Sequence, residues 1–348
     1  MIKNSINPIE KGTPSVFVVG SPLQVMCAVE AIHDLEIKDY VFYAVMGNNA
    51  RDNQIRESLN FFKIDYIEIE KHKDIYPYKK RLLILKSNNN RFQRAFVGGY
   101  GSMHHYFWAM RHLSDHSVIL TLDDGVETVT LLQDKSKLPK PANKAHFINN
   151  ILLWLAVRKR NIDLRKKLYT IYSDIKSNDF TIYSNSFSHI GHLSGEKSVN
   201  GVFFAGTTHK NFYTSVGIKE EDYYDMLDKL FQWIIKSYPD DRKVYIPHGT
   251  DKDERVKMMC INNGFEYIKP NCNIELFLCE LIDVPRAVFG FTSSCLFNVK
   301  KMFKGVDSVN ILIKINGEAK EVYETISNYY QMNGIQTKVY SFPEKNFL

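Results

Sequence analysis

The stretch SVFVVGSPLQVMCAVEAI, residues 15–32, decides the fold. Its first part is a short run of β-branched and aromatic residues that ends on a glycine, which predicts a buried strand entering a tight turn. The second part carries apolar residues at helical spacing, and Pro22 stands in its first turn, where proline suits a helix start. A strand followed directly by a helix is the opening of a parallel βαβ unit.

The same alternation of strands and helices continues along the chain. Strand-like runs at 40–46, 94–99 and 117–122 are separated by helical patterns, and a second series begins at 201–206. This order predicts parallel sheets with helices on both faces.

The length of 348 residues exceeds one ordinary domain. A polar stretch rich in Ser and Asn at 173–200 separates the two series. We therefore expect an α/β protein with two Rossmann-like domains, residues 1–195 and 196–348, whose parallel sheets face a central cleft. The last helix either belongs to the second domain or packs back on the first.

The composition is that of a soluble globular protein, with 44% hydrophobic and 24% charged residues. A formal net charge of +6 fits anionic ligands or an anionic surface. No zinc knuckle, aromatic-basic RNA motif or long basic run is present, which argues against nucleic acid as a partner. The five cysteines form no CxxC pair and the N-terminus has no apolar signal segment, so we expect a cytoplasmic protein with reduced thiols.

The segment 144–168 combines an apolar patch with a cluster of basic residues. One interpretation is a long amphipathic helix whose basic face is solvated. The alternative is peripheral contact with anionic lipid on the inner face of the cell membrane, where lipid-linked acceptors reside. The basic residues are Arg158, Lys159, Arg160, Arg165, Lys166 and Lys167.

Two adjacent carboxylates, Asp123 and Asp124, follow the strand-like run at 117–122 and precede Gly125. In open α/β sheets, ligands bind at the carboxyl ends of the strands. An ordinary Asp has a pKa near ~3.9, so it is ionised at neutral pH and can accept a proton from an attacking hydroxyl. Asp and Gly are also frequent turn residues, so the alternative is a plain turn.

Three polar loops in the second half suit a phosphate group. Each follows a strand-like run, and the hydroxyls, the imidazole and the free N–H groups of a helix N-terminus can donate to phosphate oxygens. A serine before a helix is also an ordinary N-cap, so both roles remain open. The loops are Gly206-Thr207, Pro247-His248-Gly249 and Thr292-Ser293-Ser294.

The order of these motifs resembles that of the bacterial sialyltransferases and polysialyltransferases of the GT-B type. The signatures of that family are an acidic pair before Gly, then His-Pro, then a Ser/Thr pair. The resemblance spans roughly residues 15–305 and includes the opening strand–loop–helix. The chain departs from this pattern at one point. The family has proline after the histidine, whereas here Gly249 follows His248 and Pro247 precedes it.

The resemblance implies a role for each matching residue. Asp124 would be the general base, with Asp123 as its support or as the alternative base, and His248 would act on the departing phosphate. Glu275 is the candidate for the donor ribose, and Ser21 and Gln24 would contact the acceptor. The remaining donor-binding residues would be Gly206, Thr207, Pro247, Gly249, Thr292, Ser293 and Ser294.

By the same resemblance, the N-terminal domain would bind a surface-glycan acceptor of lipooligosaccharide or capsule, and the C-terminal domain would bind CMP-sialic acid. The implied reaction inverts the anomeric centre and needs neither a metal ion nor another cofactor. Three alternatives remain: a transferase for another CMP-nonulosonic acid or a Kdo-type donor, a nucleoside-diphosphate-sugar transferase, and a non-catalytic nucleotide- or glycan-binding protein on the same scaffold.

Overall fold

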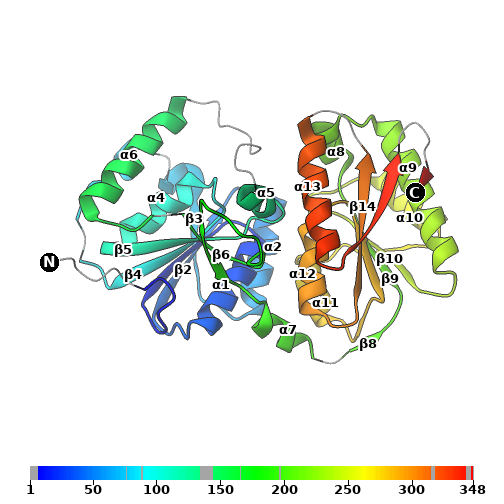
Figure 1. Ribbon diagram of the computed structural model, residues 1–348, viewed down its shortest axis with the longest axis horizontal. Coiled ribbons are helices and arrows are strands. Elements are labelled where there is room, and N and C mark those ends of the chain that lie inside the picture. Colours follow the sequence, from blue (N-terminus) through cyan, green and yellow to red (C-terminus); the bar gives the residue numbers. More distant parts are fainter. Residues whose placement is uncertain are drawn as a thin grey trace. The chain divides into compact units, whose positions relative to one another are not determined.

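A computed structural model describes most of the chain, and within it the chain divides into two compact units, Met1–His189 (unit 1) and Ile190–Leu348 (unit 2). The division lies inside the polar stretch expected to join two domains, a few residues before position 195. Helices cover both faces of a seven-stranded, mainly parallel sheet in each unit (Figure 1), which confirms the expected α/β class. The described residues are 7–75, 77–87, 89–133, 144–164, 166–195, 197–314, 318–341 and 346–347.

The sheet of unit 1 has the order β3-β2-β1-β4-β5-β6-β7, with all neighbours parallel. The chain runs outward from β1 through β2 and β3 and then crosses to β4, so the topological switch point lies between β1 and β4. The strands are β1 Ser15–Val19, β2 Tyr40–Met46, β3 Ile67–Glu70, β4 Phe92–Gly98, β5 Leu113–Leu122, β6 Lys167–Thr170 and β7 Thr181–Ser184.

Strand β1 is buried along its whole length, as expected for a central strand covered on both faces. The ring of Phe17 stacks on Phe42 of β2 at 5.5 Å and on Phe96 of β4 at 5.0 Å between centroids. Helix α1, Pro22–Asp34, then starts at Ser21, whose Oγ accepts the N–H of Gln24 at 3.3 Å. The opening stretch therefore forms the strand, turn and helix that its sequence predicts.

Helices α4 and α6 share a hydrophobic core with the central strands of unit 1. Phe107 and Met110 of α4 and Leu152 and Leu153 of α6 belong to it. The other helices of the unit are α2 Ala50–Phe61, α3 Tyr78–Arg81 and α5 Glu127–Gln133, with short η segments at Lys71–Ile75 (η1) and Leu82–Leu85 (η2); α4 spans Met103–His112, α6 spans Lys144–Arg160, and α7, Ser188–Ser194, crosses the unit boundary.

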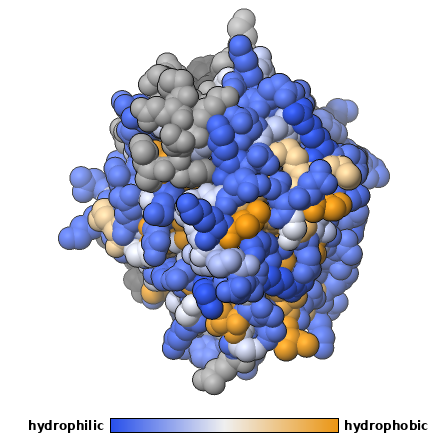
Figure 2. Space-filling view, turned by 90° about the vertical axis from the view of Figure 1, so that its right-hand side faces the viewer, coloured by the Kyte–Doolittle hydropathy of each residue, from blue (hydrophilic) through white to orange (hydrophobic). Residues whose placement is uncertain are grey.

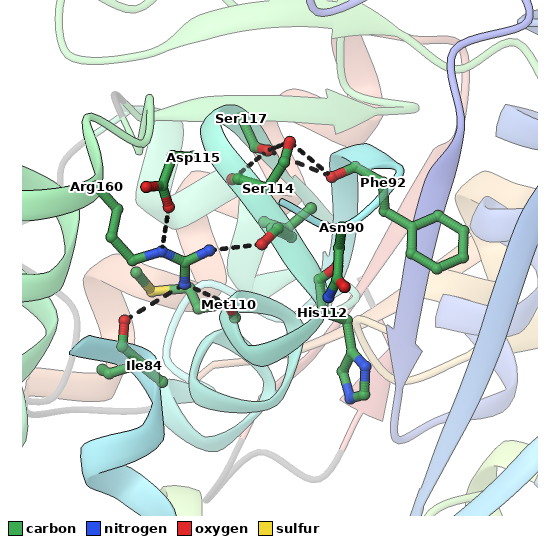
Figure 3. A network of polar contacts seen from close by, with 10 residues as sticks. Ile84, Asn90, Phe92, Met110, His112, Ser114, Asp115, Ser117 and Arg160 are labelled. Carbon is green, nitrogen blue, oxygen red and sulfur yellow. Dashed lines mark hydrogen bonds and ion pairs between the residues drawn. The ribbon is translucent and has the colours of Figure 1, made fainter. Parts of the chain in front are cut away.

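The C-terminal residue of α6, Arg160, is buried, with 1% of its surface exposed. Its Nε pairs with Asp115 at 2.8 Å, and its terminal nitrogens donate to the carbonyl oxygens of Ile84 at 3.3 Å and of Met110 and Leu113 at 2.5 Å (Figure 3). Arg160 is therefore an internal anchor of the helix, and its inclusion in an exposed basic face was wrong.

Two further basic residues of that cluster are also engaged within unit 1. Lys167 is buried in β6 and pairs with Asp163 at 2.8 Å, and Lys166 pairs with Asp179 at 2.9 Å. Arg165 lies outside the described residues. Among the residues of this cluster that the structure describes, Arg158 and Lys159 are exposed, whereas Arg160 and Lys167 are buried. The basic residues of the cluster therefore do not all lie on one solvated face.

Unit 2 repeats the doubly wound plan in the order β11-β10-β9-β13-β14-β15-β16, with its switch point between β9 and β13. β15 and β16 pair antiparallel, and the other neighbours pair parallel. The strands are β9 Val202–Ala205, β10 Lys243–Ile246, β11 Glu266–Tyr267, β13 Ala287–Gly290, β14 Asp307–Lys314, β15 Gln336–Ser341 and β16 Asn346–Phe347; β8 Ser198–Val199 and β12 Asp283–Val284 form a separate pair.

The last helix, α13, packs on β14 and β15 and so belongs to unit 2. The amphipathic helix α9 supplies much of the core of this unit, including Tyr223, Leu227 and Phe231. The helices are α8 His209–Val216, α9 Glu220–Ser237, α10 Glu254–Asn262, α11 Ile274–Glu280, α12 Ser294–Met302 and α13 Glu318–Met332.

The face of the molecule shown in Figure 2 is mainly hydrophilic, with small separate apolar patches. Within the described part of the chain, no helix is long and apolar enough to cross a membrane.

Candidate functional site

Polar loops of unit 1 meet at the carboxyl ends of β1, β4 and β5, beside the switch point. Gly20 follows β1, Gly99 follows β4, and Asp123 and Asp124 follow β5. The register aligns these strands, since Val18 pairs with Val97 and Val97 pairs with Thr121. Because neighbouring strands are about 4.8 Å apart, the three loops lie side by side.

The side chain of Gln24 joins these loops. Its Oε1 accepts the N–H of Gly20 at 2.8 Å, and its Nε2 donates to Oδ1 of Asp124 at 2.9 Å. A backbone N–H can only donate, so this contact fixes which end of the amide is the oxygen. A Cβ at Gly98 would lie 1.9 Å from Gln24 Oε1. The glycine therefore makes room for the amide that orients Asp124.

Asp124 is an exposed residue, but its carboxylate end is crowded by the backbone of Gly99, where a Cβ would lie 2.6 Å from Oδ2. This partial loss of hydration raises the pKa of Asp124 above its usual value, and the hydrogen bond from Gln24 and the charge of Arg51 oppose the rise. Gly125, at φ +74°, allows the tight turn that follows. The result is an oriented carboxylate that solvent can reach.

Asp123 occupies a different environment, with 1% of its surface exposed. Its Oδ1 accepts the hydroxyl of Thr170 at 2.5 Å, and its Oδ2 accepts the N–H of Ile171 at 2.9 Å. Burial raises the pKa of Asp123 to about 6, against the effect of these two hydrogen bonds. Asp123 thus ties β5 to the end of β6, and an incoming hydroxyl has no direct access to it.

His105 of α4 packs against the same loops, and the sequence, which offered His104 and His105 only as a possible metal-ligand pair, did not predict this contact. Its Nδ1 is 2.5 Å from the carbonyl oxygen of Gly98, which can only accept, so Nδ1 carries a proton. Burial lowers its pKa to about 4, and the ring is neutral at pH 7. A Cβ at Gly20 would lie 3.0 Å from its Nε2. The glycines that end the first and fourth strands were the available signal for this close packing.

In unit 2, three polar loops follow the adjacent strands β10, β9 and β13. Ile246 pairs with Ala205, and Ala205 pairs with Gly290, so the ends of these strands are aligned. Gly206 donates its N–H to Ile246 O at 2.8 Å, and a Cβ at this position would lie 2.1 Å from the hydroxyl of Tyr245. The structure therefore brings the loops at Gly206-Thr207, Pro247-Gly249 and Thr292-Ser294 to one sheet edge.

The loop around His248 fixes its tautomer. Its Nδ1 lies 3.3 Å from the N–H of Thr250 and 2.8 Å from the hydroxyl of the same residue. Because the backbone N–H can only donate, Nδ1 is an acceptor, and the neutral imidazole carries its proton on Nε2. His248 is half-buried, as is Gly249, whereas Pro247 is buried. The imidazole can thus donate from Nε2 to a phosphate oxygen.

The loop that enters α12 has the features of an anion site. Thr292 adopts φ +44°, an uncommon conformation for a residue with a Cβ, and its buried Oγ1 has no hydrogen-bond partner among the described residues. Ser293 caps the helix, accepting the N–H of Cys295 at 3.4 Å, and Ser294 begins it. The positive end of the helix dipole and an unpaired hydroxyl therefore occur together.

Glu275 has a different position from the other candidates of unit 2. It lies in the first turn of α11 and is 4% exposed. Its Oε2 accepts from Asn273 at 2.6 Å, and its Oε1 accepts from Asn298 of α12 at 2.7 Å. The carboxylate thus joins α11 to α12. Each of its oxygens can accept a further hydrogen bond, but the small exposed fraction of Glu275 restricts the approach of a ribose hydroxyl.

Across the described part of the chain, no three His, Cys, Asp or Glu side chains are grouped so as to hold a metal ion. The groups that the structure places at the strand ends of the two units are carboxylate, imidazole, hydroxyl and backbone N–H groups.

Comparison with solved structures shows that the fold is that of GT-B proteins. The GT-B domain of a sialyltransferase from Photobacterium damselae matches with a TM-score of 0.51 and 13% identity, over 94% of this chain and 99% of that one. An α/β-galactoside α-2,3-sialyltransferase from Photobacterium phosphoreum matches with a TM-score of 0.50 and 12% identity, over 94% and 99%.

A putative UDP-N-acetylglucosamine 2-epimerase from Listeria monocytogenes is similar to the same degree, with a TM-score of 0.50 and 12% identity over 90% of this chain and 82% of that one. No protein-family model and no curated protein matches the sequence. Transferases and an epimerase thus share this architecture, and the site residues must decide between such activities.

Proposed function

We propose that the chain is a glycosyltransferase that moves sialic acid from CMP-sialic acid to a glycan acceptor. The observation that carries the proposal is the pair Asp123 and Asp124: one carboxylate is buried and structural, and the other is solvent-accessible, oriented by Gln24 and raised in pKa. That is the arrangement that a general base at a strand end requires. The fold similarity to two sialyltransferases supports the choice of donor.

On the acceptor side, Asp124 takes the proton of the acceptor hydroxyl while the oxygen of that hydroxyl bonds to the anomeric carbon of the donor. The bond from that carbon to the phosphate oxygen breaks, and CMP leaves with the electron pair. Because the hydroxyl attacks the face opposite to CMP, the configuration of the anomeric carbon is inverted. Gln24 holds the carboxylate through Nε2, and we assign Ser21 and Gln24 to contacts with the acceptor. A general base of this kind contributes about 10²–10⁴-fold in rate.

On the donor side, the groups of unit 2 stabilise the charge that develops on the leaving phosphate. The Nε2–H of His248, the hydroxyl of Thr292 and the N-terminus of α12 with Ser293 and Ser294 are the donors in this proposal. Each well-placed donor can contribute about 3–4 kcal/mol to the transition state. Gly206 and Thr207 border the same edge, and Glu275 stays our candidate for the ribose.

The test is an assay of the purified chain with CMP-sialic acid and a panel of galactosides, in the presence of EDTA. Mass spectrometry should show CMP release and an acceptor heavier by one sialic-acid residue, with no added metal ion. Parallel reactions contain other CMP-nonulosonic acids, CMP-Kdo and UDP-N-acetylglucosamine. Turnover of only one of these would assign the alternative donor, or an epimerase if no acceptor is consumed. CMP binding without any turnover would indicate a non-catalytic protein.

Replacing Gln24 with Met should move the acidic limb of the kcat/KM profile to higher pH. The hydrogen bond from Gln24 lowers the pKa of Asp124, so its loss raises that pKa, and the base is protonated at a higher pH than in the wild type. A hydrogen bond to a charged group contributes about 1.5–3 kcal/mol, which predicts a roughly ten-fold or larger loss on the acidic side. At high pH the loss should shrink to the part that comes from the lost acceptor contact of Gln24. A loss that does not grow on the acidic side would contradict the positioning role.

Replacing His248 with Ala should weaken CMP binding about ten-fold or more and also lower kcat. The reason is that Nε2–H donates to the phosphate in both ground and transition states, and such a bond contributes about 1.5–3 kcal/mol. Calorimetry with CMP, UMP and UDP measures the affinity. The matched control is His192→Ala, which removes an exposed imidazole from α7. Tighter binding of UDP than of CMP by the wild type would overturn the donor assignment.

A further inference from the structure

The outer face of α6 is unusually apolar for a helix surface that meets solvent. Four large apolar side chains are exposed on it: Ile148 (51%), Ile151 (42%), Trp154 (56%) and Leu155 (41%). Residues three and four positions apart are neighbours on a helix, so these four form one stripe. We call it the outer stripe.

The opposite face of the same helix is already used for folding. Leu152, Leu153 and Ala156 are buried in the core of unit 1. A helix that is apolar on both sides is normally covered on both sides. The outer stripe therefore exceeds what the fold of unit 1 requires, and it calls for a partner of its own.

The exposure of the outer stripe is not caused by a loosely attached helix. Arg160 anchors the C-terminal end of α6 through Asp115 and three carbonyl oxygens (Figure 3). Nearer the N-terminal end, Arg81 donates to Oδ1 of Asn149 at 2.7 Å. Both halves of the helix are tied to unit 1, so the outer stripe has a fixed orientation.

The charges beside the outer stripe identify the partner. The guanidinium of Arg158 lies over the ring of Trp154, 5.4 Å from its centroid, and Lys159 is exposed next to it. No Asp or Glu occurs between residues 144 and 160. Trp with leucine and isoleucine on one face, bordered by cations, is the composition of helices that lie in the interface of an anionic bilayer.

We propose that α6 docks unit 1 on an anionic lipid bilayer. The outer stripe enters the headgroup region, Trp154 lies at the level of the headgroups, and Arg158 and Lys159 bind lipid phosphates. This inference does not depend on the proposed transfer reaction, because it uses none of the residues to which that reaction is assigned. The sequence offered contact of the segment 144–168 with anionic lipid as one of two interpretations, and the proposal assigns that contact to the outer stripe with Arg158 and Lys159.

The test is co-sedimentation of the full chain with vesicles of phosphatidylcholine, with and without phosphatidylglycerol. Binding is expected to the anionic vesicles and to weaken at high salt, and the Trp154 fluorescence should shift to the blue on binding. The double variant Trp154→Ser and Leu155→Ser should lose most of the binding. The double variant Arg158→Gln and Lys159→Gln should bind about 25-fold more weakly, since each cation near an anionic surface contributes about five-fold.

Matched controls carry the same changes elsewhere on the chain. Met258→Ser with Ile282→Ser removes two exposed apolar residues, and Lys304→Gln with Lys314→Gln removes two exposed cations. Both controls should bind as the wild type does. The proposal is overturned if the wild type does not sediment with anionic vesicles, or if all variants bind equally. It is also overturned if the outer stripe instead forms a dimer of the chain, detected by sedimentation equilibrium and lost in Trp154→Ser.

Discussion

Asp124→Asn is expected to lower the rate of transfer about 10²–10⁴-fold while CMP affinity stays within about two-fold of the wild type. The amide has the shape of the carboxylate and keeps the turn, but it cannot accept a proton. Its effect should appear in kcat, because in the proposed function Asp124 acts on the incoming hydroxyl, whereas groups of unit 2 bind the nucleotide. Single-turnover product formation and calorimetry with CMP measure the two quantities separately.

The neighbouring residue provides the control. In Asp123→Asn, the new amide group can accept through only one atom, so the hydroxyl of Thr170 and the N–H of Ile171 cannot both keep their acceptor. We expect a loss of about 1–3 kcal/mol in the free energy of unfolding, with turnover retained by the folded protein. If Asp123→Asn abolishes turnover in a stable protein and Asp124→Asn does not, the base is Asp123. If neither change affects turnover, the two residues form only a turn.

Much of the fold could be predicted because the central strands are encoded locally. Strands β1, β9 and β13, and the C-terminal parts of β4 and β5, are mainly apolar, buried runs that end on Gly or lead into a polar turn. In a parallel sheet such runs alternate with helices, so their order along the chain also predicts the class of fold. The same rule predicted that the polar groups after these strands would gather at the sheet edges, as the loops of each unit do.

The contacts that orient the candidate base could not be predicted, because they join distant parts of the chain. Gln24 stands in the first turn of α1, and Asp124 follows 100 positions later. Nothing near Gln24 in the sequence indicates that its amide will bond both to Gly20, after β1, and to Asp124, after β5. The requirement for Gly98 is equally non-local, since its purpose is to leave room for that amide.

Glu275 and Arg160 illustrate a second limit, which is that charge alone does not predict exposure. Glu275 is buried because two asparagine amides satisfy its oxygens. Arg160 belongs to a basic run, yet it is buried because the carbonyl oxygens at the end of α4 need donors. A buried charge needs a set of partners that folding brings together, and those partners lie far away in the sequence.

Arg160→Met is expected to lower the free energy of unfolding of unit 1 by about 3–5 kcal/mol. Helix α4 passes into β5 at His112 and Leu113 without a connecting loop, and its last carbonyls have no helical partners. Arg160 supplies donors to Met110 O and Leu113 O, and it also pairs with Asp115. Methionine fills the volume but leaves these oxygens buried without donors.

The variants Arg158→Met and Lys159→Met are the matched controls, because both residues are exposed on the same helix and surface substitutions usually change stability by about 0.5 kcal/mol or less. Arg160→Lys should be intermediate, since an ammonium group offers three donors and cannot reproduce the guanidinium fork. Urea unfolding in a Trp233→Phe background follows unit 1, because the remaining tryptophans, Trp108 and Trp154, belong to it. Equal unfolding free energies for Arg160→Met and Lys159→Met would show that Arg160 does not anchor α6, and the fixed orientation of the outer stripe would lose its support.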